Sequence, residues 1–209
     1  MRPPSAVLAI LAALVLVGVG CAREASWEAA VDAWAWPAPL PDLPLVDQDG
    51  QAFSLGRHAE DWVLLGFVFT RCSVVEACPL TMTRMAAVQR RWQEVTAEGR
   101  TEGTDLHLLA LTLDPAWDTP ERLHAYGARH GIDPASFTLA TGPEPLLGEA
   151  LPSMLSVLVL PDEEEILRHS VKLFLLRPGL EVAADWSDAE ASAEGIVGRI
   201  LSEHGADPR

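Results

Sequence analysis

Residues 62–85 read WVLLGFVFTRCSVVEACPLTMTRM and contain an apolar run, two cysteines and the beginning of a helical pattern. The run 63–69 is apolar throughout and rich in strand-forming residues, which is typical of a central strand covered on both faces of a sheet. Cys72 and Cys78 follow with five residues between them, and Pro79 begins a segment whose apolar residues recur at helical spacing. The pattern predicts two thiols in a loop between a central strand and a helix N-terminus.

The position of these thiols favours redox chemistry, a metal site, or both. A helix N-terminus carries partial positive charge, which favours a thiolate over a thiol. Soft thiolates combined with an imidazole suit Cu(I) and also Zn(II). The alternative is a structural disulfide or two inert thiols. However, a short loop gains little entropic stabilisation from a cross-link, and strand-to-helix junctions are where α/β sheets place their sites. We therefore favour a functional pair.

The composition indicates a single folded domain and argues against a nucleic-acid-binding protein. With 209 residues, 49% of them hydrophobic, the chain can supply one sizeable core, so we expect one folded domain over residues 43–209. The net charge of -15 argues against nucleic acid as a partner, because nucleic acids require basic patches. The three cysteines are too few for the disulfide framework of a small secreted protein.

The N-terminal segment predicts membrane targeting. Arg2 precedes an apolar run over 6–20, which closes on small residues and Cys21. This resembles a bacterial lipoprotein signal in which Cys21 is lipidated, although Gly18 stands where such signals usually carry leucine. An uncleaved anchor and ordinary cleavage are the alternatives. All three place the domain outside the cytoplasmic membrane, at its periplasmic face, behind an anchor segment (1–21) and a Pro/Trp-rich extended tether (22–42).

The order of the predicted elements indicates an α/β fold. A hairpin turning at Asp49-Gly50 precedes alternating strands and helices with a parallel core, in which Asp118 or Thr119 caps the second helix. The chain then closes with an antiparallel hairpin and a final helix. This is a thioredoxin-like arrangement, a central mixed sheet flanked by helices. The expected elements are a hairpin in 43–55, strands at 63–69, 106–113, 137–140, 166–176 and 181–186, and helices at 79–99, 119–131, 144–150 and 188–204.

Several stretches resemble the Sco/SenC family over about residues 43–203. They are FVFTRC at 67–72, Cys78-Pro79, LTLDPAWDTPERLHAYGARHG at 111–131, and His169-Ser170 before a strand that ends in Pro178-Gly179. The resemblance implies a membrane-tethered thioredoxin-fold protein that binds copper, as Cu(I) or Cu(II), through two cysteines and a histidine. Such proteins help to assemble the dinuclear copper centre of cytochrome c oxidase. The implied ligands are Cys72, Cys78 and His169, with Asp114 close to the site.

Two features depart from the usual pattern of this family. Most relatives have three residues between the cysteines, where this chain has five, and Arg168 stands before His169 where an aspartate is common. Asp114 has an equally good interpretation as a turn residue before Pro115. Met82 follows Cys78 at helical spacing, as does Met85, and core packing explains both methionines better than copper ligation does.

Two functions remain open. The first is a copper chaperone that delivers the metal to the copper-centre subunit of cytochrome c oxidase or to another periplasmic copper protein. The second is an extracytoplasmic thiol-disulfide oxidoreductase, in which Cys72 and Cys78 form the redox-active pair. His169 distinguishes them, because a copper site requires it and a dithiol reductase does not. A peroxiredoxin is disfavoured, since Phe69 stands three residues before Cys72, where that class has threonine.

Overall fold

The computed structural model describes residues 26–33, 35, 38–72, 78–161, 167–187 and 190–205. The strands are β1 Pro44–Asp47, β2 Ala52–Ser54, β3 Trp62–Val68, β4 Leu106–Thr112, β5 Phe137–Thr141, β6 Val159–Pro161, β7 Leu167–His169, β8 Lys172–Arg177 and β9 Glu181–Ser187. The helical segments are α1 Trp27–Asp32, η1 Leu55–His58, α2 Cys78–Ala97, α3 Pro120–His130, η2 Leu146–Ala150, α4 Leu151–Met154 and α5 Ala193–Gly205.

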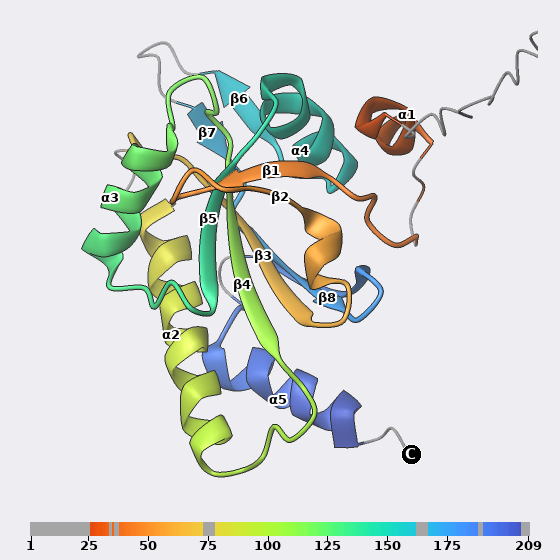
Figure 1. Ribbon diagram of the computed structural model, residues 1–209, viewed down its shortest axis with the longest axis vertical. Coiled ribbons are helices and arrows are strands. Elements are labelled where there is room, and N and C mark those ends of the chain that lie inside the picture. Colours follow the sequence, from red (N-terminus) through yellow and green to blue (C-terminus); the bar gives the residue numbers. More distant parts are fainter. Residues whose placement is uncertain are drawn as a thin grey trace, which may run out of the picture.

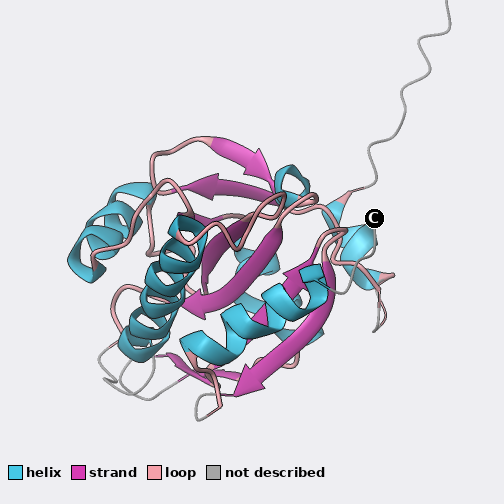
Figure 2. Ribbon diagram, turned by 90° about the horizontal axis from the view of Figure 1, so that it is seen from below, coloured by secondary structure: helices cyan, strands magenta, loops and turns pink. Residues whose placement is uncertain are grey.

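A mixed sheet with the strand order β2-β1-β5-β4-β3-β8-β9 forms the centre of the molecule (Figure 1). β3 pairs in parallel with β4, and β4 in parallel with β5. β8 runs antiparallel to β3 and forms a hairpin with β9. Helices lie on both sides of the sheet (Figure 2). The predicted thioredoxin-like α/β class is confirmed.

Strand β3 is buried along its whole length, as its apolar sequence predicts. Because side chains alternate along a strand, β3 contributes to two cores. Leu64 and Val68 belong to the core under α2, α3 and α5. Leu65 and Phe67 belong to the core on the other face, which η2 and α4 cover. The helix that follows the cysteines is therefore fixed to the most buried strand of the sheet.

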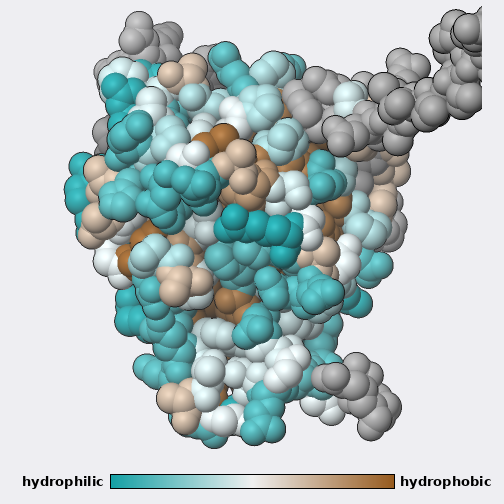
Figure 3. Space-filling model, viewed as in Figure 1, coloured by the Kyte–Doolittle hydropathy of each residue, from teal (hydrophilic) through white to brown (hydrophobic). Residues whose placement is uncertain are grey.

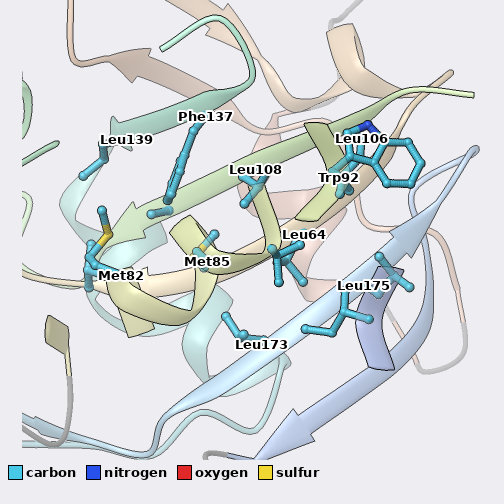
Figure 4. Packing of buried hydrophobic residues seen from close by; sticks show 14 of the residues in the cluster. Leu64, Met82, Met85, Trp92, Leu106, Leu108, Phe137, Leu139, Leu173 and Leu175 are labelled. Carbon is cyan, nitrogen blue, oxygen red and sulfur yellow. The ribbon is translucent and has the colours of Figure 1, made fainter. Parts of the chain in front are cut away.

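Helix α2 crosses β3 at very close range. A Cβ atom built on Gly66 would lie 2.8 Å from the sulfur of Met85, so only glycine permits this approach without rearrangement. Met82 and Met85 are fully buried, and Figure 4 shows them among the leucine and phenylalanine side chains of the sheet. Their interpretation as core residues agrees with this packing.

Helix α3 begins and ends at residues that the sequence predicts as caps, and the structure decides between the two candidates for its N-cap. Thr119 is the N-cap, and its side chain accepts a hydrogen bond from the Arg122 N–H. Gly131 ends the helix in the left-handed conformation, at φ 64. Asp118, the other candidate for the N-cap, is buried instead and accepts hydrogen bonds from Thr70, after β3, and from Thr112, at the end of β4.

The strand predicted over 166–176 is wrong as a single element. The structure divides this stretch into β7, which ends at His169, and β8, which begins at Lys172. β7 pairs with β6, a strand that the sequence pattern does not predict, in a separate two-stranded sheet. Ser170 bonds to Leu158 through its own N–H and through its side-chain oxygen, so its backbone leaves the line of the strand.

Two predicted helices differ in extent. The helix expected over 144–150 begins as η2 and continues as α4 to Met154. The last helix, expected from residue 188, begins as α5 at Ala193. The Ser192 side chain accepts a hydrogen bond from the Gly195 N–H, so it provides the capping interaction that fixes the later start.

The predicted tether is not extended throughout. Residues 27–32 form helix α1, and the Ser26 side chain accepts a hydrogen bond from the Ala29 N–H at its start. Leu40 is buried in the core that contains Leu43, and its N–H donates to the Leu180 carbonyl oxygen at 2.9 Å. A soluble fragment that keeps this core must therefore begin before Leu40. No helix among the described residues is long and apolar enough to cross a membrane, and Cys21 lies outside the described residues.

Candidate functional site

Cys72 and Cys78 lie where the central strand leaves the sheet and α2 begins. Cys72 is half-buried, and its N–H donates to the Phe69 carbonyl oxygen at 3.2 Å in a turn directly after β3. Cys78 is the first residue of α2 and is fully buried. The two cysteines are thiols rather than a disulfide, and their side chains are hydrogen-bonded to each other.

The electrostatics at Cys78 differ from the expectation for a helix N-terminus. Hydrogen bonding with the Cys72 side chain, followed by burial, raises the pKa of the Cys78 thiol far above its usual value. These effects outweigh the favourable helix dipole. Cys78 therefore retains its proton in the metal-free protein, and a metal must displace that proton when it binds.

Asp114 lies beside the cysteines, two residues beyond the end of β4. Its side chain accepts a hydrogen bond from Arg71 Nε at 2.6 Å, and Arg71 directly precedes Cys72. The Arg71 guanidinium also lies over the ring of Trp117, 4.9 Å from its centroid. The Asp114 carbonyl oxygen accepts the N–H groups of Trp117 and Asp118. Asp114 thus combines the turn role with a position beside the cysteine loop.

Asp118 is the residue near the site whose position sequence reasoning did not predict, since it was expected only as a helix cap. It is fully buried, and its carboxylate accepts the Thr70 N–H at 3.0 Å and the hydroxyl groups of Thr70 and Thr112 at 2.5 Å each. Burial raises the pKa of Asp118. The carboxylate joins the ends of β3 and β4 and fixes Thr70, two residues before Cys72. The signal was present in the sequence, since Asp118 and Thr119 are both N-cap residue types and a helix has only one N-cap position.

His169 ends β7 and precedes the strand β8, which enters the central sheet beside β3. Leu173 of β8 pairs with Gly66 of β3 in antiparallel register, so β8 enters the sheet near the end from which Cys72 leaves. His169 precedes β8 by three residues and pairs with Val159. Its side chain is outside the described set. Among the side chains that are described, no group of three His, Cys, Asp or Glu residues could hold a metal ion.

The other histidines have separate roles. His58 and His107 stack with their ring centroids 3.9 Å apart at the opposite end of β3 and β4. Burial, followed by the charges of His58 and Arg57, lowers the pKa of His107 to about 3, so it is neutral. His124 contacts Asp49, His130 packs against the Tyr126 ring, and His204 bonds to the Glu102 carbonyl oxygen.

A groove of about 400 Å³ adjoins Asp114, and its lining includes Pro115, Glu144, Glu149 and Val159. The large hydrophobic residues exposed among the described parts of the chain are Trp117 and Leu158. Trp117 contacts Arg71, and Leu158 is bonded to Ser170, next to His169. Trp117 therefore lies beside the residue that precedes Cys72, and Leu158 lies beside the residue that follows His169. Elsewhere, hydrophilic side chains dominate the face shown in Figure 3, with small hydrophobic patches between them.

Comparisons with known proteins bear on the family and the fold of the chain. The family model described as SCO1/SenC matches residues 40–203. A protein of Stutzerimonas stutzeri, whose name proposes that it binds copper, is 39% identical over 87 residues, which are 42% of this chain and 39% of that protein. The aligned stretch thus spans about two fifths of that relative's length.

Two solved structures share the fold. The crystal structure of Arabidopsis thaliana ScoI with copper bound has a TM-score of 0.65 at 18% identity and covers 80% of this chain and 98% of its own. A structure of BsSco has a TM-score of 0.67 at 20% identity and covers 82% of this chain and 96% of its own. BsSco is described as a member of the Sco family of cytochrome c oxidase assembly proteins in which a disulfide switch was identified.

Proposed function

The chain belongs to the SCO1/SenC family, and from that premise we propose that it is a copper chaperone with a site made of Cys72, Cys78 and His169. It would hand copper to the copper-centre subunit of cytochrome c oxidase or to another periplasmic copper protein. One observation carries the proposal: the two hydrogen-bonded thiols follow β3, and β8, which His169 precedes by three residues, enters the sheet near that same end of β3.

The donor atoms fit copper as a cargo. Two thiolates and one imidazole form a soft ligand set that suits Cu(I). The same ligands can also bind copper as Cu(II). Each thiol releases its proton when the metal binds, so loading depends on pH. Three ligands leave one coordination position open. A ligand atom of the receiving protein can bind copper there before the chaperone releases it.

The surroundings of the thiols suit transfer to another protein. Cys72 is half-buried rather than enclosed, and Trp117, which contacts the neighbouring Arg71, exposes apolar surface close by. Exposed apolar residues beside a functional site are typical of protein contacts. Arg71 is fixed by Asp114 and Trp117, so the residue next to Cys72 is already ordered before a partner arrives.

The proposal also locates the domain at the periplasmic face of the cytoplasmic membrane. Lipidated Cys21, or an uncleaved anchor within 1–21, would hold it there. Residues 22–42 would connect the anchor to the domain of residues 43–209. Globomycin, which blocks lipoprotein signal cleavage, should cause an unprocessed precursor to accumulate. If processing is unaffected, Cys21 is not a lipidation site.

A thiol-disulfide oxidoreductase is the second candidate, because two thiols in contact can also form a disulfide. In that reaction Cys72 and Cys78 would lose two electrons and two protons to a disulfide of a partner. A disulfide would form between them, and the partner would be left with two thiols. The same pair serves both functions, since only the reduced pair can bind Cu(I).

The test measures both activities on the purified, reduced full chain. The copper proposal expects one equivalent of Cu(I) per chain, held tightly against a chromophoric Cu(I) chelator such as bicinchoninate. The reductase assay follows cleavage of a small aromatic disulfide under the same conditions. Weak Cu(I) binding together with fast disulfide cleavage would overturn the chaperone assignment and favour the second candidate.

A further inference from the structure

A groove lies between the turn that follows β4 and the start of β6. Its first part, of about 400 Å³, adjoins Asp114 and includes Leu113, Glu149 and Val159 in its lining. A second hollow of about 240 Å³ shares Glu149 and Val159 with it and continues to Leu158. Because the linings share residues, the two hollows adjoin, and we call them together the β6 groove. The first part alone has the volume of a typical ligand site.

The β6 groove reaches neighbours of the proposed copper ligands on two sides. Asp114 accepts a hydrogen bond from Arg71 Nε at 2.6 Å, and Arg71 directly precedes Cys72. Val159 pairs with His169 in antiparallel register. A protein segment in the groove would therefore lie against residues that adjoin the site, and it would leave the metal position itself free.

One wall of the β6 groove is η2, where Leu146–Ala150 form a π-helical turn. Turns of this kind are rare and occur frequently at functional sites. Leu146 and Leu147 are fully buried, so they fix the turn to the core. Gly148 and Glu149 line both parts of the groove. The turn therefore presents a carboxylate to the groove next to a residue that has no side chain to fill it.

The groove carries negative charge that the fold does not neutralise. Glu144 and Glu149 are exposed, and within the described part of the chain neither carboxylate forms an ion pair or a hydrogen bond. Asp114, by contrast, is paired with Arg71. The net charge of -15 attracts a basic protein to the molecule as a whole, and the two glutamates direct it to this groove.

The far end of the groove adds an apolar contact. The Leu158 side chain is 57% exposed and lines the second hollow. The Leu158 carbonyl oxygen accepts the Ser170 N–H, and the Leu158 N–H donates to the Ser170 side chain, so the backbone of the leucine is held in place. Exposed apolar residues beside a charged groove are typical of protein contacts. The groove thus suits a protein segment that carries both a basic and an apolar side chain.

We propose that the β6 groove is the docking site for the protein that receives the copper. The docked segment carries a lysine or arginine side chain that contacts Glu144 and Glu149, and an apolar side chain that packs against Leu158. This inference rests on the proposed function, because it names the kind of surface that the receiving protein presents. Docking and copper binding use different residues, so they can be measured separately.

Removal of the two groove carboxylates should weaken docking. Isothermal titration calorimetry measures how the full-length, metal-free chain binds the metal-free soluble domain of the cytochrome c oxidase subunit that carries the dinuclear copper centre. The double variant Glu144→Gln/Glu149→Gln should bind about tenfold more weakly than the wild type, because two exposed charge contacts are lost. The matched control, Glu94→Gln/Glu98→Gln, removes two exposed carboxylates that pair with arginines and do not line the groove. It should change the dissociation constant by less than about twofold.

The apolar contact and the charge contact have separate readouts. Leu158→Ser should weaken the same binding about fivefold, because the apolar area that the partner covers is lost. Since Leu158 is exposed in the free chain, thermal unfolding of this variant should match that of the wild type. Added salt screens exposed charges, so it should weaken binding of the wild type more than binding of Glu144→Gln/Glu149→Gln.

The outcomes separate this inference from the proposed function. Equal docking by the wild type and the groove double variant overturns the docking site, as do equal losses in the two double variants, because net charge alone then explains them. Cu(I) affinity, measured with bicinchoninate, should be the same in all variants, and a loss in the groove variant also overturns the inference. A wild type that holds Cu(I) and does not bind the domain overturns docking and leaves the copper site intact. A wild type that binds the domain through the glutamates and holds no Cu(I) overturns the chaperone assignment and keeps the groove as a docking site.

Discussion

Replacing Cys72 with serine is expected to weaken Cu(I) binding by about 100-fold or more, because removal of one thiolate ligand costs about 3 kcal/mol in a site of this kind. Cys78→Ala should have an effect at least as large. Cys72 is the cleaner test, since it is half-buried, whereas Cys78 is part of the core. The measurement is a chelator competition with the purified, reduced chain.

The matched control for these substitutions is Cys21→Ser, which changes the third cysteine of the chain, outside the proposed site. Its Cu(I) affinity should equal that of the wild type. If Cys72→Ser binds Cu(I) as tightly as the control does, the thiol pair after β3 is not the copper site.

Replacing Asp118 with alanine should destabilise the metal-free protein by about 3 kcal/mol, since three buried donors lose their acceptor at once. These donors are the Thr70 N–H and the hydroxyl groups of Thr70 and Thr112. The loss is large because the site is fully closed to water. Urea unfolding at neutral pH, followed by circular dichroism, measures the change in the free energy of unfolding.

Asp49→Ala provides the comparison. The Asp49 carboxylate is exposed, and the one side-chain bond described for it joins it to the exposed side chain of His124. An exposed pair of this kind contributes little, so the change should stay within about 0.5 kcal/mol. A loss for Asp118→Ala no greater than that for Asp49→Ala would contradict the bridging role of Asp118 between β3 and β4.

The helices and strands whose signals lie within a short stretch of sequence were predictable. The apolar run after Trp62 becomes the buried strand β3, and Pro79 lies in the first turn of α2. Thr119 and Gly131 end α3 by capping rules that depend on neighbouring residues alone. The placement of two thiols between a buried strand and a helix also follows from the sequence, because the signals for both elements lie within one short stretch.

The features that depend on distant partners were not predictable. The break between His169 and Lys172 exists because β7 pairs with β6 while β8 pairs with β3, and no pattern within the stretch records those partners. Leu40 belongs to the core through contacts with segments far along the chain. The raised pKa of Cys78 likewise results from hydrogen bonding with Cys72 and then from burial, which a helix N-terminus considered by itself does not reveal.

The central claim is that copper is bound by two cysteines and His169, and X-ray absorption at the copper edge of the Cu(I)-loaded chain tests it most directly. We expect two sulfur ligands and one histidine nitrogen in the wild type, the same set in the control His204→Ala, and loss of the nitrogen in His169→Ala. A nitrogen signal that persists in His169→Ala, or a wild-type site with sulfur ligands alone, would contradict the assignment.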